Sequence, residues 1–178
     1  AVLTAEGADD KPDYRAAAQW FIKAAELGVR DSQYNLAILY ARGLGVEQNL
    51  ALSYTWFATA AKQGDEDSAR KRDEIAAKLD AKLLAQAKRG EVIVLDVRPQ
   101  QEYDTAHLPC ARSLPLPELA QRLAELPRDV EIVAYCRGPF CLMSDEAVKL
   151  LRTHGYRARK TFDGVSEWQA AGLPVRGA

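Results

Sequence analysis

Cysteine is scarce in this sequence, which has three among 178 residues: Cys110, Cys136 and Cys141. A small secreted domain held together by disulfides needs more of them, so a reducing compartment, the cytoplasm, is expected. Histidine is scarcer still. His107 and His154 lie far apart, and the two close cysteines do not have the short spacing of a metal hook. We therefore expect no metal site and no other cofactor.

An excess of charge of either sign is also lacking, because 24 Lys and Arg residues face 25 Asp and Glu residues, for a net charge of −1. Nucleic acids and anionic membranes require a basic surface, so neither is expected as a partner. No apolar run approaches the ~18 residues of a membrane span, and the first residues do not form a secretory signal. Because the chain opens on Ala1 without Met, a trimmed fragment that has lost a targeting signal stays an open expectation.

The chain has two parts with different sequence patterns. Residues 12 to about 88 have a helical pattern, with helices expected at 12–27, 31–42, 48–63 and 67–88. Residues 91 to 178 alternate short β-branched runs with helical ones, which indicates an open α/β sheet. We expect a helical domain at 1–88 and an α/β domain at 89–178.

Within the helical part, pairs of features recur 36 positions apart, which fits one helix-turn-helix unit per repeat. Aromatic and alanine residues at positions i, i+3, i+4 and i+7 form a stripe that is wide enough to bury, so the aromatic pairs are expected in the core. The glycines are expected to end helices, and the Asp-Ser pairs to cap the next ones. The recurring features are Trp20-Phe21 and Trp56-Phe57, Gly28 and Gly64, and Asp31-Ser32 and Asp67-Ser68.

The run YNLAILYARGLGVEQNLALSYTWFATAAKQGD, with its glycines and alanine pairs, resembles the Sel-one-like repeat family, which is related to tetratricopeptide repeats. The resemblance covers about the first 80 residues. It implies an adaptor that stacks helix pairs and binds a protein partner.

In the second half, the apolar runs at 92–95 and 132–135 are typical of buried parallel strands. A third strand is expected at 157–161, and helices at 116–125 and 144–153. Ligands of open α/β sheets bind at the carboxyl ends of the strands. Cys136 immediately follows the second run and therefore occupies that position.

A cysteine at this position has a specific chemical requirement: only the thiolate is a strong nucleophile, and a free thiol with a pKa near ~8.5 is mostly protonated at neutral pH. Backbone N–H groups of a tight turn and the start of the next helix would favour the anion or a persulfide. Gly138 tolerates unusual dihedral angles, Pro139 stiffens the turn, and Arg137 adds a cation. We therefore expect Cys136 as an ionised thiol in a ring of main-chain amides.

Four ordered motifs make this half resemble the rhodanese family. The resemblance implies a sulfurtransferase: Cys136 takes the outer sulfur of thiosulfate or a similar donor as a persulfide and passes it to cyanide or a thiol. The motifs are LDVR at 95–98, QEYDTAHLPCA at 101–111, YCRG at 135–138 and DGVSEWQAAGLPV at 163–175.

The same resemblance assigns the residues around Cys136. The substrate-binding loop comprises Arg137, Gly138, Pro139, Phe140, Cys141 and Leu142. Structural support at the sheet end is expected from Asp96, Arg98, Glu102 and His107, with Asp96, Arg98 and Glu102 linked by charge-assisted hydrogen bonds. His107 is expected to organise a turn, and Trp168 to pack the tail helix. Cys110 replaces the usual glycine of the H-[IL]-P turn.

One departure from the family is that many relatives have an arginine five places after the cysteine, where this chain has Cys141. Cys141 has three interpretations: a thiol that attacks sulfur on Cys136, a guard against overoxidation through a disulfide, or a small packing residue, which is slightly favoured. The form CRGPFC is most similar to rhodanese modules that follow winged-helix regulators.

Two alternatives to a sulfurtransferase remain. In the first, the chain is a scaffold that senses or carries sulfur without turnover. In the second, it is a phosphatase or arsenate reductase, as are relatives with longer loops. An arginine would then be needed to bind a dianion, and Asp145 and Glu146 near the loop would oppose one.

Overall fold

The structure is a computed structural model that describes residues 12–138 and 140–177. It divides into two compact units between Leu79 and Asp80, inside helix α4 (Glu66–Lys88). The predicted domain boundary after residue 88 stays a prediction.

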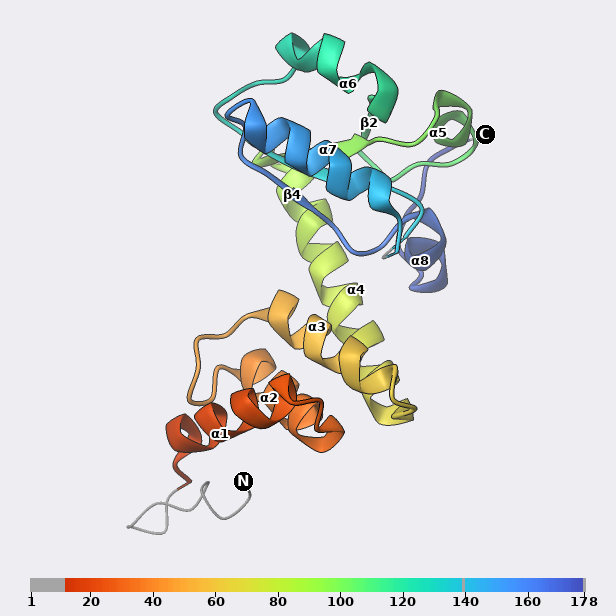
Figure 1. The fold of residues 1–178 in the computed structure, drawn as a ribbon. Helices are drawn as coiled ribbons and strands as arrows, with labels where there is room; N and C mark the ends of the chain where they lie inside the picture. The colour runs from red at the N-terminus through yellow and green to blue at the C-terminus, as the bar shows by residue number, and fades with distance from the viewer. Residues whose placement is uncertain (1–11, 139, 178) are drawn as a thin grey trace. The chain divides into compact units, whose positions relative to one another are not determined.

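The first unit is helical, as predicted, and comprises α1 (Tyr14–Glu26), α2 (Arg30–Arg42), α3 (Leu50–Ala61) and the first part of α4 (Figure 1). Gly28 and Gly64 both have positive φ, 86° and 87°, in the turns that end α1 and α3. This is the left-handed conformation that lets a helix stop, and it explains why the 36-residue period carries glycine at that point.

The aromatic pairs of the repeat divide between core and surface. Phe21 and Phe57 are buried, as predicted, but Trp20 is 56% exposed and Trp56 is only half-buried. The core prediction was therefore wrong for Trp20. A helix that buries one stripe leaves the position beside the stripe open, and the smaller Ala17 and Ala18 fill the interior instead.

Two predicted helix caps also differ from the structure. Val29 is the N-cap residue of α2 and makes no side-chain capping bond, so Asp31 lies inside the first turn rather than before it. At the start of α4, Oδ2 of Asp65 accepts a hydrogen bond from the Ser68 backbone N–H at 3.2 Å. The cap of α4 is thus Asp65, two residues earlier than the predicted Asp67.

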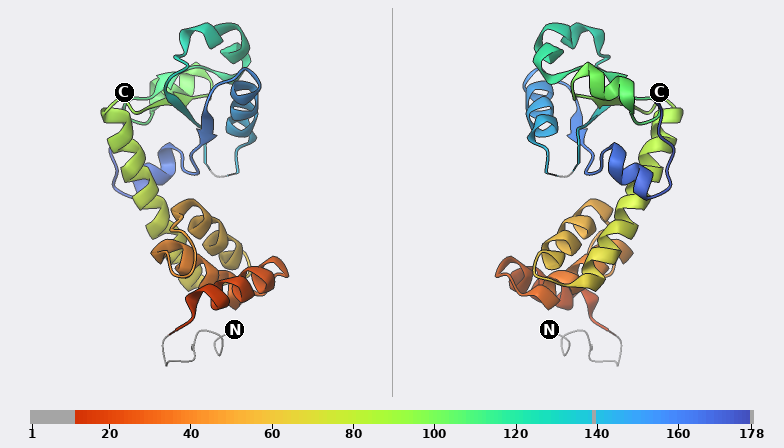
Figure 2. Two further views of the ribbon diagram at one scale, coloured as in Figure 1. Left: turned by 90° about the vertical axis from the view of Figure 1, so that its left-hand side faces the viewer. Right: turned by 90° about the vertical axis from the view of Figure 1, so that its right-hand side faces the viewer.

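The second unit contains a four-stranded parallel sheet with the strand order β2-β1-β3-β4. Figure 2 shows this part of the chain, coloured green to blue, from two opposite sides. The strands are β1 (Val92–Asp96), β2 (Arg112–Ser113), β3 (Glu131–Tyr135) and β4 (Ala158–Lys160). The predicted class, helical repeats followed by an open parallel α/β sheet, is confirmed. β2 was not predicted because its two residues have no apolar pattern.

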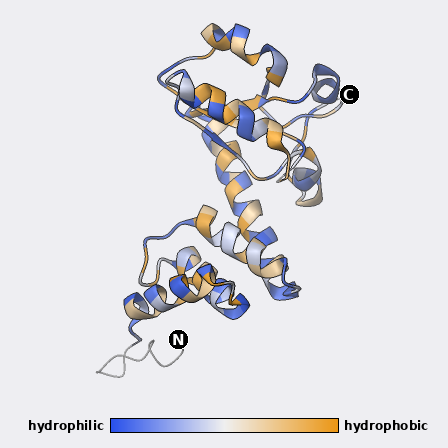
Figure 3. Cartoon of the chain, viewed as in Figure 1, coloured by the Kyte–Doolittle hydropathy of each residue, from blue (hydrophilic) through white to orange (hydrophobic). Residues whose placement is uncertain are grey.

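Helices cover both faces of this sheet. Apolar residues of α6 and α7 pack on one face, and residues of α8 and the end of α4 pack on the other, where Trp168 is 1% exposed, as predicted. Figure 3 shows apolar and polar residues alternating around these helices. The helices of this unit are α5 (Gln100–Thr105), α6 (Leu116–Arg122), the 3-10 helix η2 (Leu123–Glu125), α7 (Leu142–Thr153) and α8 (Val165–Ala170). Among the helices in the described part of the chain, none combines the length and the apolar character that crossing a bilayer requires.

Candidate active site

Cys136 lies at the carboxyl end of β3, one of the two inner strands of the sheet. Side chains alternate along the strand, so Ile132, Ala134 and Cys136 pack in the cluster beneath α7, whereas Val133 and Tyr135 face the opposite side. Cys136 is 2% exposed. The alternation of side chains along the strand therefore determines which face of the sheet this sulfur lies on. The position after Tyr135 places it where β3 ends and the loop begins.

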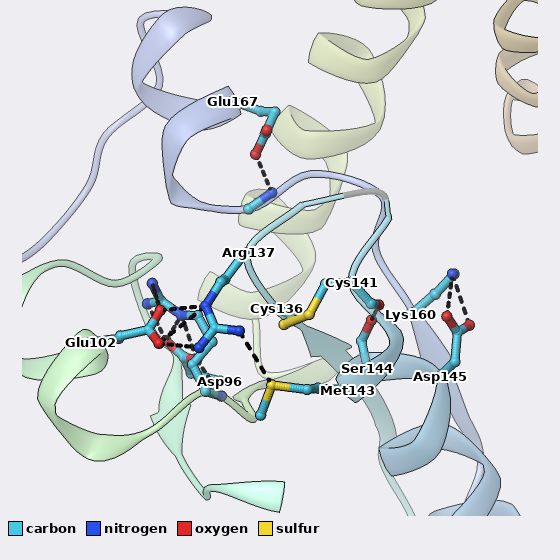
Figure 4. Close-up of a disulfide and its surroundings, with 12 residues drawn as sticks. Asp96, Glu102, Cys136, Arg137, Cys141, Met143, Ser144, Asp145, Lys160 and Glu167 are labelled. Carbon is cyan, nitrogen blue, oxygen red and sulfur yellow. Dashed lines mark hydrogen bonds and ion pairs between the residues drawn. A yellow bond between two sulfur atoms is a disulfide. The ribbon is translucent and has the colours of Figure 1, made fainter.

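The sulfur of Cys136 is bonded to that of Cys141 in a disulfide (Figure 4). The expectation of an ionised, amide-surrounded thiol at Cys136 is therefore not what the structure holds: the atom is buried and oxidised. Cys141 is half-buried and packs against the core cluster beneath α7, and its bond to Cys136 adds to this packing. The bond favours the two interpretations in which Cys141 reacts with Cys136.

The loop between the cysteines is short and leads directly into α7. The Cys141 N–H donates a hydrogen bond to the Gly138 carbonyl at 3.2 Å, and Cys141 is the residue from which α7 begins. Phe140 is 81% exposed and Leu142 is 70% exposed, so the outer rim of the loop is apolar. The predicted loop residue Pro139 lies outside the described residues.

Arg137, expected to add a cation to the loop, is engaged with Glu102. Its Nε donates to both carboxylate oxygens of Glu102 at 3.1 Å, and Figure 4 shows the side chain directed toward Glu102 and Met143. The hydrogen bond and the charge of Glu102 raise the pKa of Arg137. Much of its charge is thus balanced before any anion arrives.

Beneath this pair, Asp96 at the end of β1 holds a buried network. Arg98 donates from its backbone N–H and its Nε to Oδ1 of Asp96, at 3.0 and 2.9 Å, and its Nη1 lies 3.6 Å from Glu102. The Tyr135 hydroxyl donates to Oδ2 of Asp96 at 2.5 Å and accepts from the Leu108 N–H. The predicted hydrogen bonds between Asp96 and Arg98 are present, whereas Arg98 and Glu102 form an ion pair that is too long for a hydrogen bond.

Electrostatics explains why this network is stable although buried. Burial, followed by the nearby carboxylate of Asp96, raises the pKa of Tyr135 and keeps its hydroxyl protonated as a donor. Burial opposes the charge on Arg98, but its hydrogen bonds to Asp96 prevail and raise the pKa of its guanidinium. Charge-assisted bonds of this kind fix the ends of β1 and β3 relative to one another.

His107 lies between α5 and the turn at 108–111, and its backbone forms a β-bridge rather than part of that turn. Its role in organising the turn stays a prediction. Nδ1 lies 2.8 Å from the Tyr103 carbonyl oxygen, and its ring stacks on that of Tyr103 at 3.9 Å between centroids. The backbone of His107 pairs with that of Arg176, which ties the C-terminal segment to the stretch that follows α5. These contacts are structural in kind.

Two residues after β4 were missed by sequence reasoning. The main chain of Gly164 lies against the loop, and Glu167 accepts a hydrogen bond from the Gly164 N–H at 2.8 Å while its carboxylate lies beside Gly138. A Cβ at Gly164 would lie 2.6 Å from the carbonyl oxygen of Cys136. The only signal in the sequence was the glycine of the DGV run, which is also typical of an ordinary turn.

Within residues 12–138 and 140–177, no three His, Cys, Asp or Glu side chains are grouped so that they could hold a metal ion. The cysteine pair offers thiol-disulfide chemistry at this site. Reduction yields two thiols, one at the end of an inner strand and one at a helix N-terminus, where the positive end of the helix dipole favours a thiolate.

Comparison with known families agrees with this architecture. The model of the rhodanese-like domain matches residues 79–171, and that of the Sel1 repeat matches residues 2–29 and 30–65. Both predicted resemblances are thereby confirmed.

Individual relatives are similar over about half of this chain. An HTH-type transcriptional regulator of Mycobacterium tuberculosis, Rv0324, is 50% identical over 95 residues, which are 53% of this chain and 42% of the regulator. A sulfurtransferase of Allochromatium vinosum is 31% identical over 100 residues, which are 54% of this chain and 92% of that protein. A crystal structure of a Bacillus halodurans protein superposes with a TM-score of 0.52 and 29% identity, over 55% of this chain and 74% of the other. The chain thus spans less than half the length of the mycobacterial regulator.

Proposed function

Because this chain belongs to the rhodanese-like domain family, with Sel1 repeats ahead of that domain, we propose that it is a sulfurtransferase. Cys136 would accept sulfane sulfur from thiosulfate or a similar donor and pass it to cyanide or a thiol. The observation that carries the proposal is the position of Cys136, the residue that follows inner strand β3 and opens the loop into α7.

The reaction consists of two displacements. With the disulfide reduced, the Cys136 thiolate attacks the outer sulfur of thiosulfate, the S–S bond of the donor breaks, and sulfite leaves with the electron pair. The persulfide on Cys136 is then attacked at its outer sulfur by the acceptor, and the Cys136 thiolate is the leaving group. Covalent storage divides one difficult transfer into two easier ones.

The surrounding residues have defined tasks in this scheme. Asp96, Arg98 and Tyr135 fix the strand end from which the sulfur projects. The first turn of α7 has backbone N–H groups without intrahelical acceptors, which favour negative charge on a sulfur at its start. Burial of Cys136 keeps water away from the persulfide.

The test is thiocyanate formation from thiosulfate and cyanide by protein that has been reduced and freed of reductant. We expect turnover by the native sequence and none by Cys136→Ser. Thiocyanate formation by Cys136→Ser at the native rate would end the assignment. Cys110→Ser is the matched control, since Cys110 is an exposed free thiol outside the loop.

The Sel1 repeats support a second role, binding of a protein partner. The first unit exposes large apolar side chains that a partner would cover: Trp20, Leu27, Val29 and Leu52. If the chain is a scaffold without turnover, cells that carry Cys136→Ser will keep its physiological role, whereas cells that carry Trp20→Ser with Leu27→Ser will lose it. Loss with Cys136→Ser alone argues for the enzyme.

The cytoplasm is the proposed location, because its thiol systems would keep Cys136 and Cys141 reduced between turnovers. A redox-state measurement by alkylation of the protein in cells tests this. Mostly reduced cysteines are expected, and a fully oxidised pair would contradict it.

A further inference from the structure

We propose that Cys141 releases the sulfur carried by Cys136 as sulfide, which makes the chain a sulfane-sulfur reductase as well as a transferase. This inference rests on the proposed function, because it begins from the persulfide on Cys136. The observation behind it is the disulfide between the two residues, which is the product that such a release would leave.

The geometry allows the step without disruption of the fold. The Cα atoms of Cys136 and Cys141 lie 6.1 Å apart, and their sulfurs are bonded while both flanking elements are intact. β3 is paired through Tyr135, and α7 is formed from Leu142 onward. The bond between the two sulfurs is therefore compatible with an intact β3 and an intact α7.

The atoms and electrons of the step balance. The Cys141 thiolate attacks the inner sulfur of the Cys136 persulfide, and the bond between the inner and outer sulfurs breaks. The outer sulfur leaves with the electron pair as hydrosulfide, taking up the proton lost by Cys141. The sulfane sulfur is reduced, and the two cysteines are oxidised to the disulfide. An external dithiol then reduces this disulfide through a mixed disulfide and regenerates both thiols.

Cys141 is suited to be the attacking thiol. It begins α7, a helix of 12 residues, and the positive end of the helix dipole favours its thiolate. The Ser144 hydroxyl donates to the Cys141 carbonyl at 3.2 Å, which helps to hold the residue at the helix start. Because Cys141 is tethered five residues from Cys136, it competes with free acceptors at a high effective concentration.

The burial of the two residues determines how the pair is reduced. Cys136 is 2% exposed, whereas Cys141 is half-buried at the rim. A reductant therefore reaches the sulfur of Cys141 first, and Cys136 leaves as the thiolate. That order restores the sulfur acceptor while the reductant is still attached to Cys141.

A single-turnover experiment tests the inference. Cys110→Ser protein is used throughout, so that the exposed Cys110 contributes no thiol. It is reduced, freed of reductant under anaerobic conditions and given one equivalent of thiosulfate without acceptor. Sulfite, sulfide and the intact protein mass are then measured. We expect sulfite and sulfide in equal amounts and a protein that has lost two hydrogens and carries no extra sulfur.

The matched variant adds Cys141→Ser to this background. It is expected to release sulfite, to gain one sulfur in mass and to release at least about tenfold less sulfide. If the Cys110→Ser protein also keeps the added sulfur and releases no sulfide, the reductase inference is overturned while the transferase proposal stands. If neither protein takes up sulfur, the transferase proposal fails first.

The Cys110→Ser measurement is decisive even if the double variant does not fold, because mass alone separates persulfide from disulfide. A role of Cys141 only as a guard against overoxidation predicts the persulfide under these anaerobic conditions, and so counts against the inference. In multiple turnover with a dithiol, sulfide should accumulate well beyond one equivalent per chain. Its failure to do so would equally contradict a reductase.

Discussion

The main chain of Gly164 lies directly against the carbonyl group of Cys136, so close that a Cβ at Gly164 would stand 2.6 Å from that oxygen. The φ of Gly164 is −108°, so an alanine is not excluded by backbone conformation. Only the space taken by the loop requires glycine here.

Gly164→Ala should therefore displace the loop, lower the free energy of unfolding by about 1–3 kcal/mol and reduce sulfur uptake by Cys136. Gly172→Ala is the control: its φ is 71°, but a Cβ there meets open space. It should cost stability and leave sulfur uptake unchanged. Denaturant unfolding and the single-turnover mass measurement check both variants, and normal uptake by Gly164→Ala would contradict the argument.

Cys110 has a φ of 63°, the left-handed conformation that glycine adopts without strain. The left-handed region costs a residue with a side chain about 1–2 kcal/mol, and a glycine at this position would avoid that cost. Part of the gain is lost, because glycine has greater conformational freedom in the unfolded chain. Cys110→Gly should thus stabilise the protein by about 0.5–1 kcal/mol in urea unfolding. Cys110→Ser, which keeps a side chain, should change little, and equal gains from both would point to the thiol rather than the backbone.

Asp80, near the middle of α4, is buried, and its pKa is raised to about 9. Burial is the largest cause, followed by the hydrogen bond to Asp163 and the negative charge of that residue. The charge of Glu167 adds to the effect. The folded protein thus keeps a proton that the unfolded chain releases near its ordinary pKa of ~3.9. Stability should fall as pH rises from about 4 to 9, by at most ~1.4 kcal/mol per pH unit.

Asp80→Asn mimics the protonated carboxyl and should flatten this part of the pH profile. Denaturant midpoints measured between pH 5 and 9 give the comparison. An unchanged slope in the variant would show that another group is responsible.

Glu102→Gln should release Arg137 from its ion pair and leave one more net positive charge beside the loop. Arg137 is an exposed partner, with 54% of its side chain accessible, so the gain is small. We expect kcat/KM for thiosulfate, a dianion, to rise about two- to fivefold, since an exposed ion pair is worth up to ~1 kcal/mol. This gain in kcat/KM should shrink as salt is added, because salt screens the charge of Arg137.

Glu118→Gln is matched to this change, because it breaks a similar exposed pair with Arg122 on α6. It should leave the rate with thiosulfate unaffected. A similar rise in both variants would indicate a general charge effect rather than the release of Arg137.

The sequence predicted those parts of the fold whose signal is local. The apolar run of β3 and the 36-residue period gave the strand and the helices, because periodicity records burial directly. β2 and the exposure of Trp20 were not predicted. Both depend on which distant parts of the chain pack against those residues, and a local sequence pattern does not contain that information.

At the site, the motif around Cys136 was sufficient to place this cysteine at the carboxyl end of a buried strand and to predict the charged pair Asp96 and Arg98. Two of the three interpretations of Cys141 involved a reaction with Cys136, and the sequence could not decide among them, since the path of the loop determines whether the two sulfurs meet. The engagement of Arg137 by Glu102, 35 residues earlier in the chain, required the tertiary fold.

β3 has a neighbour on each side up to Ala134, and Tyr135, the residue before Cys136, is still paired with Asp96 of β1. We therefore expect approach or separation of the two sulfurs to come mainly from the Cys141 side. Cys136 should thus move less than Cys141 when the disulfide forms or breaks. The amide hydrogens of residues 132–135 should accordingly exchange with solvent far more slowly than those of 140–142 in both redox states.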